Sequence, residues 1–155
     1  MTNNIALQFT CQRRALGLNI SELADMLDID KRVISFVERG ERKPTDDHKL
    51  SMFSLSSHYE LLTDIIKQEA QAFKIQNPAA RLVLPYFSDF ERFKSVTGNQ
   101  HKNYWRLWQA AISHLVLAGV INHINDDADL PVSFKKTHFW LDLGYDVADL
   151  SEDMQ

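Results

Sequence analysis

The chain has 155 residues, of which 45% are hydrophobic, so it can bury a substantial core in one domain or two small ones. Its only cysteine, Cys11, excludes an intrachain disulfide, and we expect it to be a small buried apolar residue in a reducing compartment. No run of about 18 apolar residues occurs, and the N-terminus lacks the pattern of a signal peptide, which predicts a soluble, cytoplasmic protein.

The charge is distributed unevenly, and its distribution is more informative than the formal net charge of -4. Residues 31–43 contain five basic and two acidic side chains, whereas residues 120–155 contain two lysines and eight acids. A chain of this kind can bind a polyanion on one face and repel it elsewhere. The composition therefore does not exclude a nucleic-acid partner.

Three short helices with recognisable ends are predicted near the N-terminus. Gly17 suits the open position after the first helix, Asn19 caps the second, and Asp30 caps the third. Glu22 stands three residues after Asn19, as in a capping box. The expected helices cover residues 4–16, 20–27 and about 31–39.

The rest of the chain is also predicted to be mostly helical. Apolar residues recur at helical spacing, Ser88 with Glu91 indicates a capping box, and Gly98 indicates a helix end. Residues 81–87 are a candidate strand, and Pro85 confines it to the edge of a sheet because proline has no N–H to pair with a neighbouring strand. Further helices are expected over residues 46–73, from 88 to before 98, over 101–118, and within 131–150, before an acidic tail.

These elements predict an all-α fold with, at most, one short strand. We expect a helix-turn-helix domain over residues 1–45, whose fourth helix continues to about residue 73. Residues 46–155 are expected to form a helical dimerisation or regulatory region.

The spacing of apolar residues in the N-terminal segment is specific. Residues 17–24 (GLNISELA) are followed by apolar side chains that point into a small shared core, and Ala24 is small where two helices cross closely. The later positions of the pattern are Leu27, Ile29, Ile34, residues 38–40 (ERG) and Pro44. Over about residues 9–45 this pattern resembles the Cro/lambda-repressor (XRE-type) helix-turn-helix. The resemblance implies that residues 31–38 form the recognition helix, which enters the major groove of DNA.

Carried over by position, the resemblance implies a set of DNA-binding residues. Lys31 or Arg32 would donate to guanine, Ser35 would serve a base or a phosphate, and Phe36 would pack on a thymine methyl. An exposed aromatic at position 36 would otherwise lie in water. The implied DNA-binding residues are Asn19, Lys31, Arg32, Ser35, Phe36, Arg39, Arg42 and Lys43.

The residues around the recognition helix have separate implied roles. Arg39, Arg42 and Lys43 are expected to contact phosphates. Glu38 is expected to pair with Arg13 and to brace the first and third helices. Many family members carry glutamine where this chain has Ile20, so a phosphate contact there is lost or is made by Asn19 or by a backbone N–H.

A weaker resemblance extends over about residues 4–120. Residues 46–47, 82–87 and 103–108 (NYWRLW) are similar to the YdiL-like regulators and the related anti-CRISPR-associated autoregulators. This resemblance implies an all-helical, dimerising second part and autorepression through an inverted repeat in double-stranded DNA. Because the helix over 101–118 is apolar on two sides, we expect it either in the centre of the C-terminal domain or across a subunit interface. The residues predicted for a dimer interface are Tyr104, Trp105, Trp108, Ile112, Leu115 and Val116.

We therefore predict a dimeric DNA-binding repressor without cofactor or metal. Two alternatives stay open: an antitoxin-like or adaptor module whose C-terminal helices bind a protein, and a regulator that binds RNA with the same basic surface. An enzyme is not expected. The six histidines do not stand at metal-ligand spacings, and no phosphate-binding glycine loop or nucleophile motif occurs.

Overall fold

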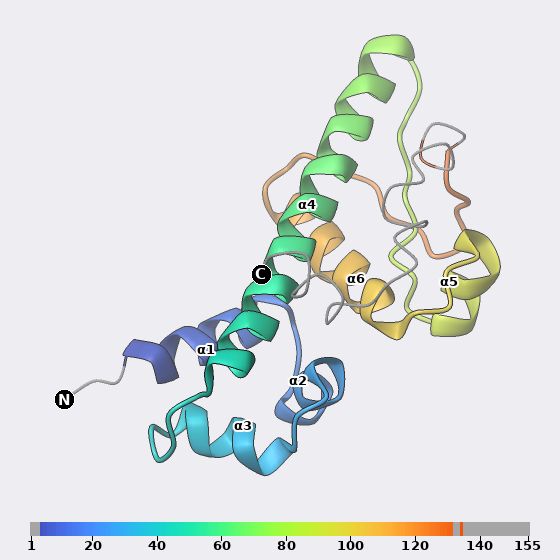
Figure 1. Cartoon of the computed structure of the whole chain (residues 1–155). Helices are drawn as coiled ribbons and strands as arrows, with labels where there is room; N and C mark the ends of the chain where they lie inside the picture. The colour runs from blue at the N-terminus through green and yellow to red at the C-terminus, as the bar shows by residue number, and fades with distance from the viewer. Residues whose placement is uncertain (1–3, 132–133, 135–155) are drawn as a thin grey trace. The chain divides into compact units, whose positions relative to one another are not determined.

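The computed structural model describes residues 4–131 and residue 134. Within this part of the chain it contains helices and no strand, so the predicted all-α fold is confirmed (Figure 1). The helices are α1 (Asn4–Ala15), α2 (Ile20–Leu27), α3 (Lys31–Glu38), α4 (Asp46–Gln76), α5 (Phe90–Thr97) and α6 (Lys102–Leu117).

The ends of α2 and α3 are set by residues immediately beside them, as the sequence predicts. The Asn19 Oδ1 accepts a hydrogen bond from the Glu22 N–H (2.8 Å), and the Glu22 Oε1 accepts one from the Asn19 N–H (3.1 Å), which completes a capping box. Asp30 caps α3 by accepting from the Arg32 N–H (2.8 Å). After α1, Gly17 takes a left-handed conformation with φ of 70°.

The described residues divide into two compact units, with the boundary inside α4 between His58 and Tyr59. In the first unit α3 packs against both α1 and α2. The core residues include Leu23 and Ile34, which are at most 1% exposed. Each short helix alone buries too little apolar surface to be stable, so this shared core holds the three together.

The second unit is built around the ring of Trp108, which is fully buried on α6. Its Nε1 donates to the Pro85 carbonyl oxygen (2.9 Å), and its ring lies 5.7 Å from that of Phe87. The Phe87 carbonyl oxygen accepts from Trp105 Nε1 (2.6 Å) and from Gln109 Nε2 (2.8 Å). Side chains of α6 therefore hold the irregular segment before α5, including Phe87, whose φ is 60°.

Several expectations for the second half are wrong in detail. The candidate strand is a single parallel bridge between Leu84 and Ile124, because Pro85 has no N–H to continue the pairing. The cap of α5 is Asp89 and not Ser88, since Ser88 hydrogen-bonds the Asp126 carboxylate instead. Apart from residues 131 and 134, the helix predicted within 131–150 and the acidic tail lie outside the described residues.

Two further observations concern the sequence predictions. Cys11 is exposed on α1 and not buried, because the buried side of that helix is formed by Ala6 and Phe9. Among the described residues, no helix is both long and apolar enough to span a membrane.

Candidate nucleic-acid interface

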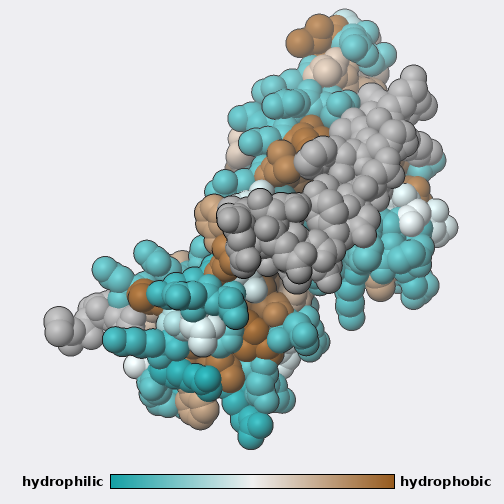
Figure 2. Space-filling view, in the orientation of Figure 1, coloured by the Kyte–Doolittle hydropathy of each residue, from teal (hydrophilic) through white to brown (hydrophobic). Residues whose placement is uncertain are grey.

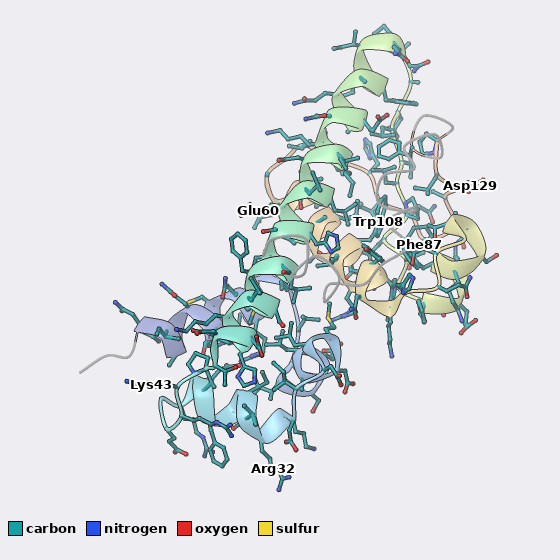
Figure 3. The ribbon with its side chains drawn as sticks, viewed as in Figure 1. Arg32, Lys43, Glu60, Phe87, Trp108 and Asp129 are labelled. Atoms are coloured by element: carbon teal, nitrogen blue, oxygen red, sulfur yellow. The ribbon has the colours of Figure 1, made fainter. Side chains whose placement is uncertain are left out.

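The recognition-helix candidate, α3, presents its N-terminal cations to solvent. Lys31 and Arg32 are exposed at the first positions of the helix, whereas Ile34 and Val37 face the core. Figure 3 shows Arg32 projecting outward from α3. Ser35 is half-buried between these two sides. The helix therefore separates into an apolar, buried side and a polar side that a ligand can reach, and hydrophilic residues cover much of the surface in view around α3 (Figure 2).

The Arg32 side chain is held by a weak local partner. Its Nη2 lies 3.2 Å from the Asp30 Oδ2, and its Nε donates to the Asp30 Oδ1 (3.3 Å). The side-chain hydrogen bond from Arg32 is the main reason that the pKa of Asp30 is lowered, and it likewise raises the pKa of Arg32. Because the Arg32 side chain is 80% exposed, its pair with Asp30 contributes little to stability. Arg32 can therefore leave Asp30 and donate to another acceptor.

Phe36 lies one turn further along α3 and is 38% exposed, which is unusual for a phenylalanine in so short a helix. The guanidinium carbon of Arg39 lies 5.0 Å from the centre of the Phe36 ring, a cation–π contact that sequence reasoning missed. The spacing of three residues on a helix was the available signal. Arg39 therefore partly covers the ring and is itself fixed beside α3.

Three basic residues follow the recognition helix. Arg39 also pairs with Glu41, at 3.5 Å between exposed side chains, whereas Arg42 and Lys43 are exposed in the loop before α4. Burial, followed by repulsion from Arg42, lowers the pKa of His48 at the start of α4. A neutral His48 leaves the positive charge of this loop on its arginine and lysine side chains.

The orientation of α3 is fixed by an ion pair with α1. Arg13 Nε lies 2.8 Å from Glu38 Oε2, and Arg13 Nη2 donates to Glu38 Oε1 (2.9 Å), so the contact has two parallel bonds. Thr10 donates to the same carboxylate (3.0 Å), and Arg13 Nη1 donates to the Leu18 carbonyl oxygen (2.9 Å). The hydrogen bonds that Arg13 donates to Glu38 raise the pKa of Arg13, and this outweighs the opposing effect of burial.

Two of these partners were not anticipated from the sequence. Thr10 precedes Arg13 by three residues on the same face of α1, which is the signal that would have found it. The Leu18 carbonyl offers no such signal, since any backbone can accept. The network orients α3 against α1 through one charged group from each helix.

Asn19 lies at the start of α2 and uses its side-chain oxygen in the capping box. A phosphate contact from this residue would therefore fall to its amide nitrogen or to the backbone. The N–H groups of the first turn of α2 are a suitable anion site in principle, because the positive end of a helix attracts anions.

The predicted dimer-interface residues all lie on α6, but the structure separates them by exposure. Four of them are at most 4% exposed and so pack inside the second unit of their own chain; these are Tyr104, Trp108, Ile112 and Leu115. In this structure they are therefore covered by other residues of the same unit, and Trp108 contacts Phe87 and the Pro85 carbonyl oxygen. Val116 is 42% exposed and Trp105 is half-buried.

Among the described residues, no group of three or more His, Cys, Asp or Glu side chains could hold a metal ion. No curated protein matches the chain. Residues 12–48 match the family model described as helix-turn-helix, a range that contains α2, α3 and the ion-paired Arg13 and Glu38. Over this range the chain is similar to the helix-turn-helix family, which agrees with the resemblance to the XRE-type helix-turn-helix in the sequence.

Proposed function

We propose that the protein is a sequence-specific transcriptional repressor that binds an inverted repeat in duplex DNA as a homodimer. The observation that carries this proposal is the exposed side of α3, where Lys31, Arg32 and Phe36 are available on a helix whose orientation is fixed by the Arg13–Glu38 pair. A rigid helix with exposed donors at its N-terminus suits insertion into the major groove.

The basic residues divide into two groups by position. Lys31 and Arg32, at the N-terminus of α3, are placed to donate to guanine O6 and N7, and Phe36 to contact a thymine methyl. Arg39, Arg42 and Lys43, at and after the end of α3, are placed to contact phosphates, with Asn19 or the first turn of α2 contacting another. Base contacts set specificity, and phosphate contacts set affinity and its dependence on salt.

Dimerisation is part of the proposal because an eight-residue recognition helix reaches only one half-site. Two copies would place their α3 helices about 34 Å apart, one turn of the duplex. The second unit supplies exposed apolar side chains that a partner copy could cover: Leu117 is 86% exposed and its neighbour Val116 is 42% exposed. Autorepression is proposed from the sequence resemblance of about residues 4–120 to the YdiL-like autoregulators.

The test begins with duplexes selected from a random pool by the full chain and with the region upstream of its own gene. Arg32→Ala should reduce the preference for the selected site over a scrambled one by about tenfold, since one bidentate base contact accounts for a factor of this size. Arg42→Ala should weaken binding to both duplexes equally and lower the slope of log Kd against log salt by about one. Arg14→Ala, an exposed cation on α1, is the matched control.

Equal loss of specificity in all three variants, or no binding to any duplex at low salt, would refute the proposal. Competition between hairpin RNA and duplex DNA distinguishes the RNA-binding alternative, which requires the hairpin to compete better. For the dimer, Leu117→Glu should shift sedimentation of the purified protein toward the monomer, whereas Lys102→Glu, at an exposed position at the other end of the same helix, should not. A wild-type protein that stays monomeric on its operator contradicts the dimer but not DNA binding.

A further inference from the structure

The second unit contains a pocket of about 240 Å³ that DNA binding does not explain. One side of the pocket is formed by the end of α4 and the segment that follows it, and the other side by the loop after α6. Three of its lining residues carry side chains that are or can become cationic, and none of its lining residues is acidic. Its lining residues include Lys74, Arg81, Leu82, Ile121, Asn122 and His123.

The walls of this pocket are held in place by direct bonds. Lys74 Nζ donates to the Val120 carbonyl oxygen (2.9 Å), which joins α4 to the loop after α6. Just beyond the pocket, the Leu84 N–H donates to the His123 carbonyl oxygen (3.2 Å), and the Asn125 N–H donates to the Leu84 carbonyl oxygen (3.1 Å). The pocket is thus formed by the fold before any ligand arrives, which reduces the entropic cost of binding.

The polar groups of the pocket suit an anion. Lys74 uses one of its three donors on Val120, and Arg81 and His123 are exposed cationic or ionisable side chains beside it. Arg81 makes no hydrogen bond or ion pair among the described residues, so a ligand can accept from its five donors without breaking an existing bond. Asn122 adds an amide donor. Leu82 and Ile121 are buried and give the pocket an apolar base.

We propose that this pocket binds a small organic dianion, a phosphate monoester or a dicarboxylate. Two charged oxygens would be held by Lys74 and Arg81, with His123 or Asn122 on a further oxygen, while a short carbon body would rest on Leu82 and Ile121. The volume limits the ligand to roughly a dozen non-hydrogen atoms, well below the size of typical drug-like ligands. The proposal does not depend on the DNA-binding proposal.

The test is calorimetric titration of the full-length protein with three probes: inorganic phosphate, phenyl phosphate and succinate. At least one organic probe should bind more tightly than inorganic phosphate, because only the organic probes reach the apolar base. Arg81→Ala should weaken binding by about tenfold, the usual effect of losing one charge-assisted hydrogen bond. Lys67→Ala is the matched control, since Lys67 is an exposed lysine two turns before Lys74 on α4 but does not line the pocket.

Phenyl phosphate binding without succinate binding assigns the pocket to phosphate monoesters, and the reverse assigns it to dicarboxylates. The proposal is overturned if no probe binds at millimolar concentration, or if Arg81→Ala and Lys67→Ala weaken binding equally. Folding of each variant is checked by circular dichroism. Because Arg81 is exposed and makes no hydrogen bond or ion pair among the described residues, its removal should leave the helical signal unchanged, so loss of binding would report on the pocket itself.

Discussion

Removing the carboxylate of Glu38 should destabilise the first unit far more than removing any other acid near α3. Glu38 and Arg13 side chains are only 8% and 13% exposed, and they share two parallel bonds with a third from Thr10. In Glu38→Ala, the Arg13 guanidinium keeps its bond to the Leu18 carbonyl but loses its counter-ion. Breaking a buried pair costs about 3–5 kcal/mol, and the residual exposure here reduces the expected cost to about 2–3 kcal/mol.

Glu41→Ala is the matched control, because Glu41 is three residues away and also pairs with an arginine. That pair is long (3.5 Å), and both side chains are more than half exposed, so its loss should cost less than about 1 kcal/mol. The double variant Arg13→Leu with Glu38→Leu should recover much of the loss, since it removes both charges together and leaves neither unpaired.

The assay is hydrogen exchange of the full-length protein, followed by mass spectrometry, in peptides from α1 and α3. Glu38→Ala should raise the opening equilibrium of these peptides by about 30-fold or more, the factor that corresponds to 2 kcal/mol, while peptides from α6 stay unchanged. The reasoning is refuted if Glu38→Ala and Glu41→Ala have the same effect, or if the double leucine variant is less stable than Glu38→Ala.

Three other predictions concern the scaffold. Burial lowers the pKa of His58 from 6.5 to about 4, so the unfolded chain takes up a proton at higher pH than the folded chain. The free energy of unfolding should therefore fall by about 3 kcal/mol between pH 7 and pH 4, and in His58→Gln this part of the decrease should be missing from denaturation curves. Gln109→Leu removes one of the two donors to the Phe87 carbonyl oxygen. It should lower the free energy of unfolding, measured by thermal denaturation, by about 1–3 kcal/mol, whereas Ser113→Ala should lower it less. Gly17→Ala should cost about 1 kcal/mol in urea denaturation, because open space surrounds the position and only the positive φ resists a side chain; a much larger cost would contradict this account.

The ends of the short helices were predictable because their causes are local. Asn19 and Glu22, and Asp30 with the N–H two residues later, satisfy the first backbone donors of α2 and α3 within one turn of chain. The same logic failed at Ser88, whose hydroxyl bonds to Asp126, 38 positions further along the chain. A capping residue can be identified from sequence only when no distant partner competes for it.

The candidate site divides in the same way. The exposed cations of α3 follow from the spacing of its buried residues, and the pairing of Arg13 with Glu38 was expected from the family resemblance. The local contact of Arg32 with Asp30 and the cation–π contact of Arg39 with Phe36 were not foreseen, because several rotamers of a long side chain are compatible with one sequence.

The α6 helix shows what the sequence by itself could not decide. Two apolar sides indicated that α6 must be covered twice, and both a second copy and the chain itself satisfy that requirement. Tertiary structure resolved the choice for Tyr104, Trp108, Ile112 and Leu115, which pack within their own unit. Helical periodicity and caps depend on neighbours within about four residues, so the sequence by itself determines them. The surface that covers an apolar helix face belongs to segments far along the chain, so only the folded structure determines which surface it is.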